Sequence, residues 1–422
     1  MGEDQNKRKR VLLVSYACSP YRGSEAGVGW GRAYETAKHF DTWVICKKQK
    51  YEDEVRRFVE EHGDIPNLRF YFVPRTILEK IIKSIPGFYY VAYHLWQRRA
   101  YKHGLRLHQQ FHFDLVHHSN FNCFREPGFP WKLDIPCVWG PVGGTENYPW
   151  GFLWSAGIRG AISEGVRNIV NKIQFRFSPF VRKAARHAAC VIVINREGAE
   201  AFQRVHGIRT ILMQDIGESS VEETNHSGKF REGPLRILCG SAFEHRKSLH
   251  LLIMALSKMP SGLAYEVKIT GKGGPQEKRL RTLARRMGIE SRCEWLGWLP
   301  LSEFRQLFQW ADVFAFTGLR NATNTSVLHA LSQGVPVICL DLYGAGELIT
   351  TQCGVKIPVT TVREVILKIR DSLVLLANNR ELLDAYSRGA LERAAEYLWS
   401  RKGEQTAEIY RQVLGGQKNH CA

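Results

Sequence analysis

Several features that would assign this 422-residue chain to a simple class are absent from its sequence. No apolar run approaches the roughly 18 residues that a membrane-spanning helix needs. The ten cysteines are scattered, with no Cys-x-x-Cys pair and no Cys/His cluster at zinc spacing. Neither a disulfide scaffold nor a zinc domain is therefore predicted. The N-terminal stretch KRKRVLLVSYACSP has too short an apolar run for a signal peptide and is better interpreted as a strand, so we expect a cytoplasmic protein.

Acidic residues are scarce relative to basic ones. The chain has 59 Lys and Arg residues against 41 Asp and Glu, which gives a formal net charge of +18. Such an excess suggests an anionic partner, and the candidates are nucleic acid, an anionic membrane surface and phosphorylated substrates. No RNA- or DNA-binding motif accompanies the basic segments, so no nucleic-acid partner is predicted.

Buried strands and amphipathic helices alternate along the chain. RVLLVSYA (Arg10–Ala17) and TWVICKK (Thr42–Lys48) are apolar runs typical of parallel strands, and a helix is expected between them with Ser24 as its N-cap. Further strands are expected at FDLVHHS (Phe113–Ser119), IPCVWGPVGG (Ile135–Gly144) and CVIVIN (Cys190–Asn195). This alternation predicts the α/β class with a parallel sheet.

The pattern predicts two domains of similar size. Residues 220–233 are polar and predict a linker or domain junction, after which a second strand–helix series begins at LRILCGSA. An amphipathic helix closes the chain. We place the first domain at residues 1–215, with the C-terminal helix at 397–422 packing back onto it, and the second at 216–396.

Ligands of open parallel sheets bind at the carboxyl ends of the strands, so the residues that follow each strand are the candidates for a site. Gly23 follows the first strand and allows close approach of a ligand to the backbone. His117 and His118 end the strand at Phe113–Ser119, and either a ligand contact or a structural role fits them, with one at most facing the site. The first-domain candidates are thus Gly23 and one of the two histidines.

The second series offers more polar candidates. Ser241, Arg246 and Lys247 precede a helix, where cations are unfavourable unless an anion binds beside them. The Gly-rich loop at 271–274 and Trp298 follow the next two strands and suit a flat base, although Trp298 equally fits a core position. The loop after a later strand is rich in amides and hydroxyls and opens a helix, where N–H groups can bind phosphate; it contains Asn321, Thr323, Asn324, Thr325 and Ser326.

Four motifs, in this order, resemble a known family. They are YACSPYRGSEAGVGW, REPGFPWKLDIPCVWGPVGG, ALSQGVPVICLDLYGAGELI and LWSRKGEQTAEIYRQVL. Together with the two α/β domains they resemble the GT-B fold, and more narrowly the retaining glycosyltransferases of family four, the glycosyl transferases group 1 type. The resemblance implies two Rossmann-like domains facing a central cleft and a C-terminal helix that crosses back to the first domain. It covers nearly the whole chain.

The resemblance implies roles for the candidates. Lys247, with Arg246 beside it, would neutralise the diphosphate of a nucleotide-sugar donor (UDP- or GDP-linked), while Gly271, Gly273 and Trp298 would hold its base. Gly23 would lie by the donor phosphates, and Thr325 and Ser326 would bind phosphate at a helix N-terminus. His117, or less favourably His118, would contact the sugar near the reacting carbon, and Ser24 and Glu25 would face the acceptor. No metal or other cofactor is implied, since there is no Asp-x-Asp motif.

The chain departs from the family at three positions. The family carries two acids seven residues apart, Glu-x7-Glu, which contact the donor sugar and its ribose, and here Asn321 and His329 replace them. Ser241 stands where the family usually has an arginine. An amide and an imidazole can still bond hydroxyl groups. The chain is thus either a hexosyltransferase-type enzyme with an altered donor site or a non-catalytic relative that binds sugar nucleotides or acts as a membrane scaffold.

The acceptor is expected to be a saccharide or a lipid-linked group, as in the biosynthesis of polysaccharide, lipopolysaccharide or glycolipid. Two basic and aromatic segments, near residues 75–110 and 147–186, favour a peripheral position on the inner face of the cytoplasmic membrane. Ordinary surface helices fit these segments equally well. A non-hydrolysing epimerase is a third possibility, but Glu146 and Glu347 are its only candidate acids.

Overall fold

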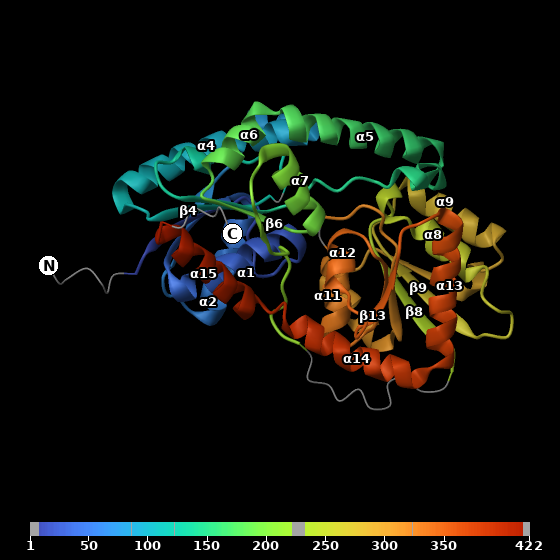
Figure 1. Cartoon of the computed structure of the whole chain (residues 1–422). Coiled ribbons are helices and arrows are strands. Elements are labelled where there is room, and N and C mark those ends of the chain that lie inside the picture. The colour runs from blue at the N-terminus through green and yellow to red at the C-terminus, as the bar shows by residue number, and fades with distance from the viewer. Residues whose placement is uncertain (1–7, 86, 122, 222–232, 323, 417–422) are drawn as a thin grey trace. The chain divides into compact units, whose positions relative to one another are not determined.

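The computed structural model describes residues 8–85, 87–121, 123–221, 233–322 and 324–416. Most of the expected linker at 220–233, and also Thr323, lie outside these ranges. The chain forms two compact units (Figure 1). Unit 1 contains Met1–Thr145, Lys172–Gly217 and Trp399–Ala422, and unit 2 contains Glu146–Asn171 and Glu218–Leu398.

Unit 1 is built on a seven-stranded parallel sheet with the order β3-β2-β1-β4-β5-β6-β7. Its strands are β1 (Arg10–Ser15), β2 (Asp41–Lys47), β3 (Leu68–Val73), β4 (Leu115–Asn120), β5 (Cys137–Val142), β6 (Cys190–Val193) and β7 (Ile211–Leu212). Val11 to Val14 are almost completely buried, as expected for a strand that is covered by helices on both faces. The alternating series therefore forms the parallel sheet that the sequence predicts.

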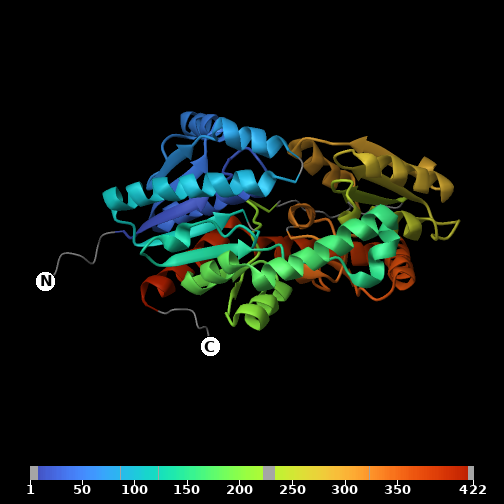
Figure 2. The ribbon, with the colours of Figure 1, turned by 90° about the horizontal axis from the view of Figure 1, so that it is seen from above.

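The helices of unit 1 connect and cover these strands. They are α1 (Ser24–His39), α2 (Gln49–His62), α3 (Ile77–Ser84), α4 (Tyr89–Phe111), α6 (Pro179–His187), α7 (Arg196–His206) and α15 (Trp399–Leu414). The C-terminal helix α15 belongs to this unit (Figure 2). It packs so closely against α1 that a Cβ on Gly31 would lie 2.4 Å from the Trp399 ring. This confirms the predicted return of the last helix to the first domain.

Unit 2 is built on a six-stranded parallel sheet with the order β10-β9-β8-β11-β12-β13. Its strands are β8 (Leu235–Gly240), β9 (Tyr265–Thr270), β10 (Cys293–Gly297), β11 (Val313–Phe316), β12 (Val337–Leu340) and β13 (Gly354–Ile357). The helices are α8 (Leu249–Leu256), α9 (Pro275–Arg286), α10 (Leu301–Trp310), α11 (Thr325–Ser332), α12 (Tyr343–Leu348), α13 (Val362–Asn378) and α14 (Arg380–Ala395). The two sheets with their helices give the two Rossmann-like units of the GT-B fold.

One segment of unit 2 comes from the part of the sequence assigned above to the first domain. Residues Glu146–Asn171 contain the 3₁₀ helix η2 (Trp150–Ala156) and most of α5 (Gly157–Phe177), and they pack with unit 2. Tyr148 and Phe152 are buried in the same apolar cluster as β8 and β9. Helix α5 continues without a break into unit 1. None of the described helices is long and apolar enough to cross a bilayer.

Candidate functional site

The loops that follow β8, β9 and β10 meet at the carboxyl edge of the unit 2 sheet. The N–H of Ser241 donates to the carbonyl of Thr270 at 3.0 Å, and the N–H of Gly271 donates to the carbonyl of Gly297 at 2.8 Å. These bonds hold Ser241, the Gly271 loop and Trp298 at one edge, as the sequence predicts for loops after parallel strands. Trp298 is 67% exposed, so the alternative that placed it in the core is wrong.

Gly271 is needed for this arrangement because of its size. A Cβ at this position would lie 1.8 Å from the carbonyl oxygen of Ser241, which is a backbone atom and cannot rotate away. The β9 loop and the β8 loop can approach each other only if residue 271 has no side chain.

We expect Gly271→Ala to force these two loops apart and to lower the free energy of unfolding by roughly 2 kcal/mol, as overpacking does elsewhere. The measurement is chemical denaturation of the variant and the parent. Gly274→Ala is the matched control, since a Cβ there meets no atom within 4 Å. Equal stability of the two variants would contradict the predicted clash.

Lys247 lies at the centre of the candidate site. It ends the 3₁₀ turn η3 (His245–Lys247) that leads from β8 to α8. Its Nζ donates to Asn321 Oδ1 at 2.5 Å, and an N–H of Arg246 also reaches that oxygen, at 3.5 Å. The N–H of Leu319 donates to the carbonyl of Arg246 at 3.0 Å. The basic turn and the amide-rich loop, which are far apart in sequence, therefore form one cluster.

The three cations of this cluster differ in their partners. Arg246 forms an ion pair with Glu244, and Arg320 forms a two-bond ion pair with Glu164, at 2.7 and 2.9 Å. Within the described ranges, no carboxylate forms an ion pair with Lys247, and its hydrogen-bond partner is the neutral amide of Asn321. Lys247 is therefore the cation in this cluster that an incoming anion can pair with.

The environment of Lys247 makes its charge costly. Burial, followed by the charge of Arg246, lowers its pKa to about 7, and Arg320 adds to the effect. Like charges and loss of solvent both disfavour the ammonium form. An anion beside Nζ would favour the ammonium form and so offset both effects. Lys247 is therefore expected to gain a proton when a phosphate binds.

The amide and hydroxyl loop opens helix α11. Asn324 is the N-cap residue but makes no side-chain capping bond, and its Oδ1 is buried without a partner. Thr325 and Ser326 are the first two helical residues, not the capping ones. Helix geometry leaves the N–H groups at this position without intrahelical acceptors. The loop thus keeps the donors that the phosphate-binding prediction requires.

His329 lies on α11 and faces a carboxylate that the sequence does not indicate. Its Nδ1 bonds Glu218, and Arg305 donates to the other oxygen of Glu218 at 3.0 Å. His329 Nε2 is buried without a hydrogen-bond partner. Glu218 therefore brings a carboxylate next to the position at which His329 replaces an acid of the family motif. These residues are 111 positions apart, and no local motif marks the pair.

The unit 1 candidates lie at the start of α1. Gly23 is the N-cap, and Ser24 is the first helical residue with a φ of 54°, so the prediction of Ser24 as the cap is wrong. Glu25 is mostly buried, and its Oε2 has no hydrogen-bond partner. Burial, and to a lesser degree the charge of Asp215, raises the pKa of Glu25 to about 8. Glu25 is therefore a neutral acid at pH 7.

The two histidines of β4 are both inside unit 1. His117 bonds the hydroxyl of Tyr410 on α15 through Nδ1, and its Nε2 lies 2.6 Å from the carbonyl oxygen of Gly140. His118 is buried on the other face of the strand without a partner, and burial lowers its pKa to about 3. Both ring nitrogens of His117 have hydrogen-bond partners, so the structural role considered above fits this residue. Neither histidine enters the functional proposal below.

A cationic cluster in unit 1 was missed by the sequence reasoning. Lys47, at the end of β2, lies 4.7 Å from the ring centre of Tyr16 and 4.6 Å from that of Tyr51, and Arg75 lies 5.4 Å from Tyr16. Burial, together with nearby cations including Lys83, lowers the pKa of Lys47 to about 8. The available signal was the pair of lysines that follows TWVIC at a strand end. Cations gathered on aromatic rings at this edge favour an anionic ligand.

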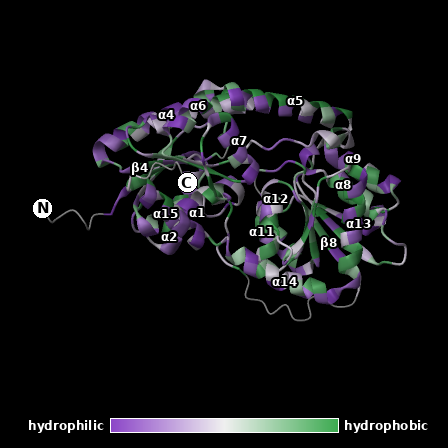
Figure 3. Cartoon of the chain, in the orientation of Figure 1, coloured by the Kyte–Doolittle hydropathy of each residue, from purple (hydrophilic) through white to green (hydrophobic). Residues whose placement is uncertain are grey.

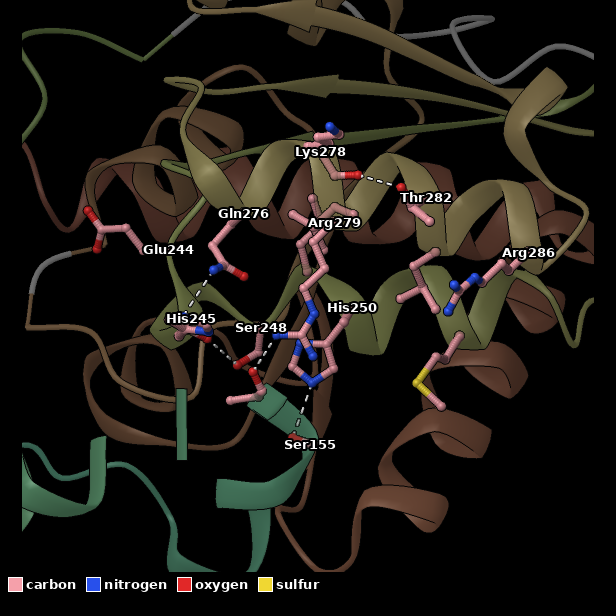
Figure 4. Close-up of a pocket in the computed structure, with 15 residues that line it drawn as sticks. Ser155, Glu244, His245, Ser248, His250, Gln276, Lys278, Arg279, Thr282 and Arg286 are labelled. Carbon is pink, nitrogen blue, oxygen red and sulfur yellow. Dashed lines mark hydrogen bonds between the residues drawn. The ribbon is translucent and has the colours of Figure 1, made fainter. Parts of the chain in front are cut away.

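A hollow in unit 2, of about 550 Å³, lies against η2, α8 and α9 (Figure 4). Several of its basic side chains have partners: Arg279 donates to the carbonyl of Ala156 at 2.9 Å, and His250 Nε2 lies 3.1 Å from Ser155 Oγ. His245 bonds Gln276 at 3.0 Å. These contacts join the Glu146–Asn171 segment to the unit, so we interpret the hollow as a packing seam.

Comparison with known proteins agrees with this geometry. Residues 220–390, which include the Lys247 cluster and helix α11, match the family described as Glycosyl transferases group 1. Residues 220–390 therefore resemble a glycosyl transferases group 1 domain. It is also 28% identical over 203 residues to colanic acid biosynthesis glycosyltransferase WcaL of Escherichia coli and 27% identical over 146 residues to that of Salmonella typhimurium. The matches cover 46% and 33% of this chain, but only 50% and 36% of those relatives.

Solved glycosyltransferase structures share the whole fold. Sucrose-phosphate synthase from Thermosynechococcus elongatus has a TM-score of 0.63 and 16% identity, over 97% of this chain and all of that one. The Anabaena protein HepE, in complex with UDP and glucose, has a TM-score of 0.60 and 16% identity, over 96% of this chain and all of that one. The GT-B fold expected from the resemblance is thus confirmed.

Proposed function

We propose that the chain is a glycosyltransferase that moves a sugar from a nucleotide-sugar donor to a saccharide or lipid-linked acceptor with retention of anomeric configuration. The observation that carries the donor half is Lys247, a cation with a neutral partner, on the segment after β8, whose first residue, Ser241, bonds the strand that leads into the Gly271 loop. The match of residues 220–390 to the glycosyl transferases group 1 family and the UDP complex of HepE support a nucleotide-sugar donor. UDP is therefore the first donor nucleotide to test, and GDP the second.

The donor would be held by unit 2. Its diphosphate would lie against Lys247 and the N–H groups that open α11, while Trp298 and the Gly271 loop would hold the base. Negative charge grows on the diphosphate as the bond to the sugar breaks, and a fixed cation there stabilises the transition state. Arg246 would add to this field from its ion pair with Glu244. Asn321 would bond a sugar hydroxyl in place of a carboxylate.

The acceptor would be held by unit 1. Lys47, Arg75 and Lys83 would attract an anionic group on the acceptor, and the neutral carboxyl of Glu25 could donate a hydrogen bond to it. Tyrosine rings, which bind sugars well, surround the same cations. The name of the WcaL relatives, which refers to colanic acid biosynthesis, supports a saccharide acceptor.

A non-catalytic donor-binding protein is the second candidate. It is favoured by Asn321, which cannot supply a charge to the sugar, and by the buried Nε2 of His329. We prefer the first proposal because a fixed cation at Lys247 would also stabilise the charge that develops on the leaving diphosphate during transfer. Turnover of the donor into a glycosylated product separates the two candidates.

The test is a thermal-shift screen of the parent chain and Lys247→Ala against UDP, GDP, ADP and their sugar conjugates. One nucleotide sugar should raise the melting temperature by mass action, and Lys247→Ala should abolish the shift. Lys258→Ala, which removes an exposed lysine of the same unit, is the matched control and should keep it. A folded parent chain that responds to none of these ligands would contradict the proposal.

A further inference from the structure

Helix α5 is oriented with its polar side inward and its apolar side outward. Trp154 of η2 begins a row of exposed apolar residues that continues along one face of α5, and exposure in this row runs from 51% at Ile169 to 77% at Trp154. Its members are Trp154, Ile158, Ile162, Val166, Ile169, Ile173 and Phe177, and we call them the α5 stripe. From Ile158 onward, their spacing of three and four residues places them on one side of α5, and Trp154 precedes that helix in η2. Figure 3 shows hydrophobic and hydrophilic positions alternating along α5.

The inward face is held by specific polar contacts. Asn168 accepts from the N–H of Tyr148 at 2.9 Å and donates to its carbonyl at 2.7 Å. Glu164 forms the two-bond ion pair with Arg320. Rotating α5 to bury its apolar side would leave these buried groups without partners, which is costly. The exposed orientation of the stripe is therefore fixed by the fold.

The charges around the stripe have one sign. Between Trp150 and His187 the chain has seven Lys and Arg residues and one acid. That acid is Glu164, which is buried in its ion pair. Arg159, Lys172 and Arg176 are exposed on α5. An occupant of this face must therefore offer apolar surface along a helix of roughly 30 Å, together with negative charge.

Helix α3 has the same arrangement of exposed apolar residues and a buried acid. Ile77, Leu78 and Ile81 are exposed, and the acid of this helix, Glu79, is buried in an ion pair with Arg99 at 2.9 Å. A lipid surface accepts any apolar face with flanking cations, and each of these helices offers one.

We propose that the α5 stripe inserts into the interface of an anionic phospholipid membrane, with its cations on the lipid headgroups. Trp154 would lie at the level of the headgroups, where indole rings are favoured. The proposal is independent of the donor site, because it rests on residues that do not belong to the Lys247 cluster.

The test is co-sedimentation of the full chain with vesicles of phosphatidylglycerol and phosphatidylcholine. We expect binding that weakens at high salt, and the double variant Ile162→Glu/Ile169→Glu should lower vesicle affinity by roughly tenfold or more. Ser163→Glu/Gln174→Glu is the matched control, since it adds the same charge to exposed positions of α5 outside the stripe. The control should lower affinity less than about threefold.

Three outcomes would overturn the proposal. They are a parent chain that stays in the supernatant, equal losses in both double variants, and a stripe variant that only converts a dimer into a monomer. Quenching of tryptophan fluorescence by brominated lipids gives a second measurement that does not depend on charged variants. Part of this quenching should disappear in Trp154→Phe, and quenching unchanged by that substitution would contradict insertion of the stripe.

Discussion

Binding of a nucleotide sugar at pH 8 is expected to take up close to one proton. Lys247 has a pKa of about 7 in the free chain, so at pH 8 only about a tenth of the molecules carry its charge. A diphosphate beside Nζ would raise the pKa back toward that of an ordinary lysine. The bound lysine is then protonated, and the proton comes from solvent.

The same linkage sets the pH dependence of affinity. Below pH 7 the lysine is already charged in the free chain, and affinity should be level. Above pH 7 each unit of pH should weaken binding by up to roughly tenfold, because a proton must be taken up. Isothermal titration calorimetry in two buffers of different ionisation enthalpy measures this uptake directly. A sugar conjugate is the better ligand for this experiment, since its phosphates do not titrate near neutral pH.

Lys247→Arg is the matched control for this prediction. Arginine stays charged across the whole range, so the variant should bind without proton uptake at this site, and its affinity should change little between pH 7 and pH 9. Proton uptake of the same size in the parent chain and in Lys247→Arg would show that another group is responsible.

The structure also indicates how much of this site could be predicted from sequence. The strands could be predicted, because β1, β8 and β12 are buried on both faces and so appear as continuous apolar runs. Since parallel strands end at one edge, the loops at Ser241, Gly271 and Trp298 could be placed together. Lys247 could be singled out because a cation before a helix N-terminus is unfavourable unless an anion binds beside it.

Other features depend on contacts between distant residues. Glu218 bonds His329 only because the segment of unit 2 that begins at Glu218 passes beside α11. No periodic pattern in the sequence predicts this contact. The orientation of α5 is decided by Asn168 and Glu164, whose partners lie at Tyr148 and Arg320. The sequence shows an amphipathic helix, but periodicity alone cannot say which face points inward.

Glu25→Gln is expected to stabilise the chain, by an amount that grows with pH. The folded pKa of Glu25 is about 8 and its ordinary value is 4.5. Between these values the unfolded chain has lost the proton and the folded chain keeps it, so the free energy of unfolding falls as pH rises, by about 1.4 kcal/mol per unit. Glutamine is never charged and avoids this loss. At pH 8 the variant should exceed the parent by about 4 kcal/mol, and near pH 4.5 the two should agree.

Glu54→Gln is the contrasting control in the same unit. Burial works against the charge of Glu54, but hydrogen bonds from Arg22 and Ser19 outweigh it, so its pKa is lowered. A lowered pKa gives stability that is present above the unfolded value and lost as pH falls, so Glu54→Gln should destabilise at neutral pH, with the difference vanishing in acid. Thermal unfolding of the three proteins across this pH range measures both signs. A constant gain for Glu25→Gln at every pH would indicate better packing. A gain that follows pH would mean that unit 1 keeps a neutral acid at a cost in stability, as expected of a group that binds a ligand.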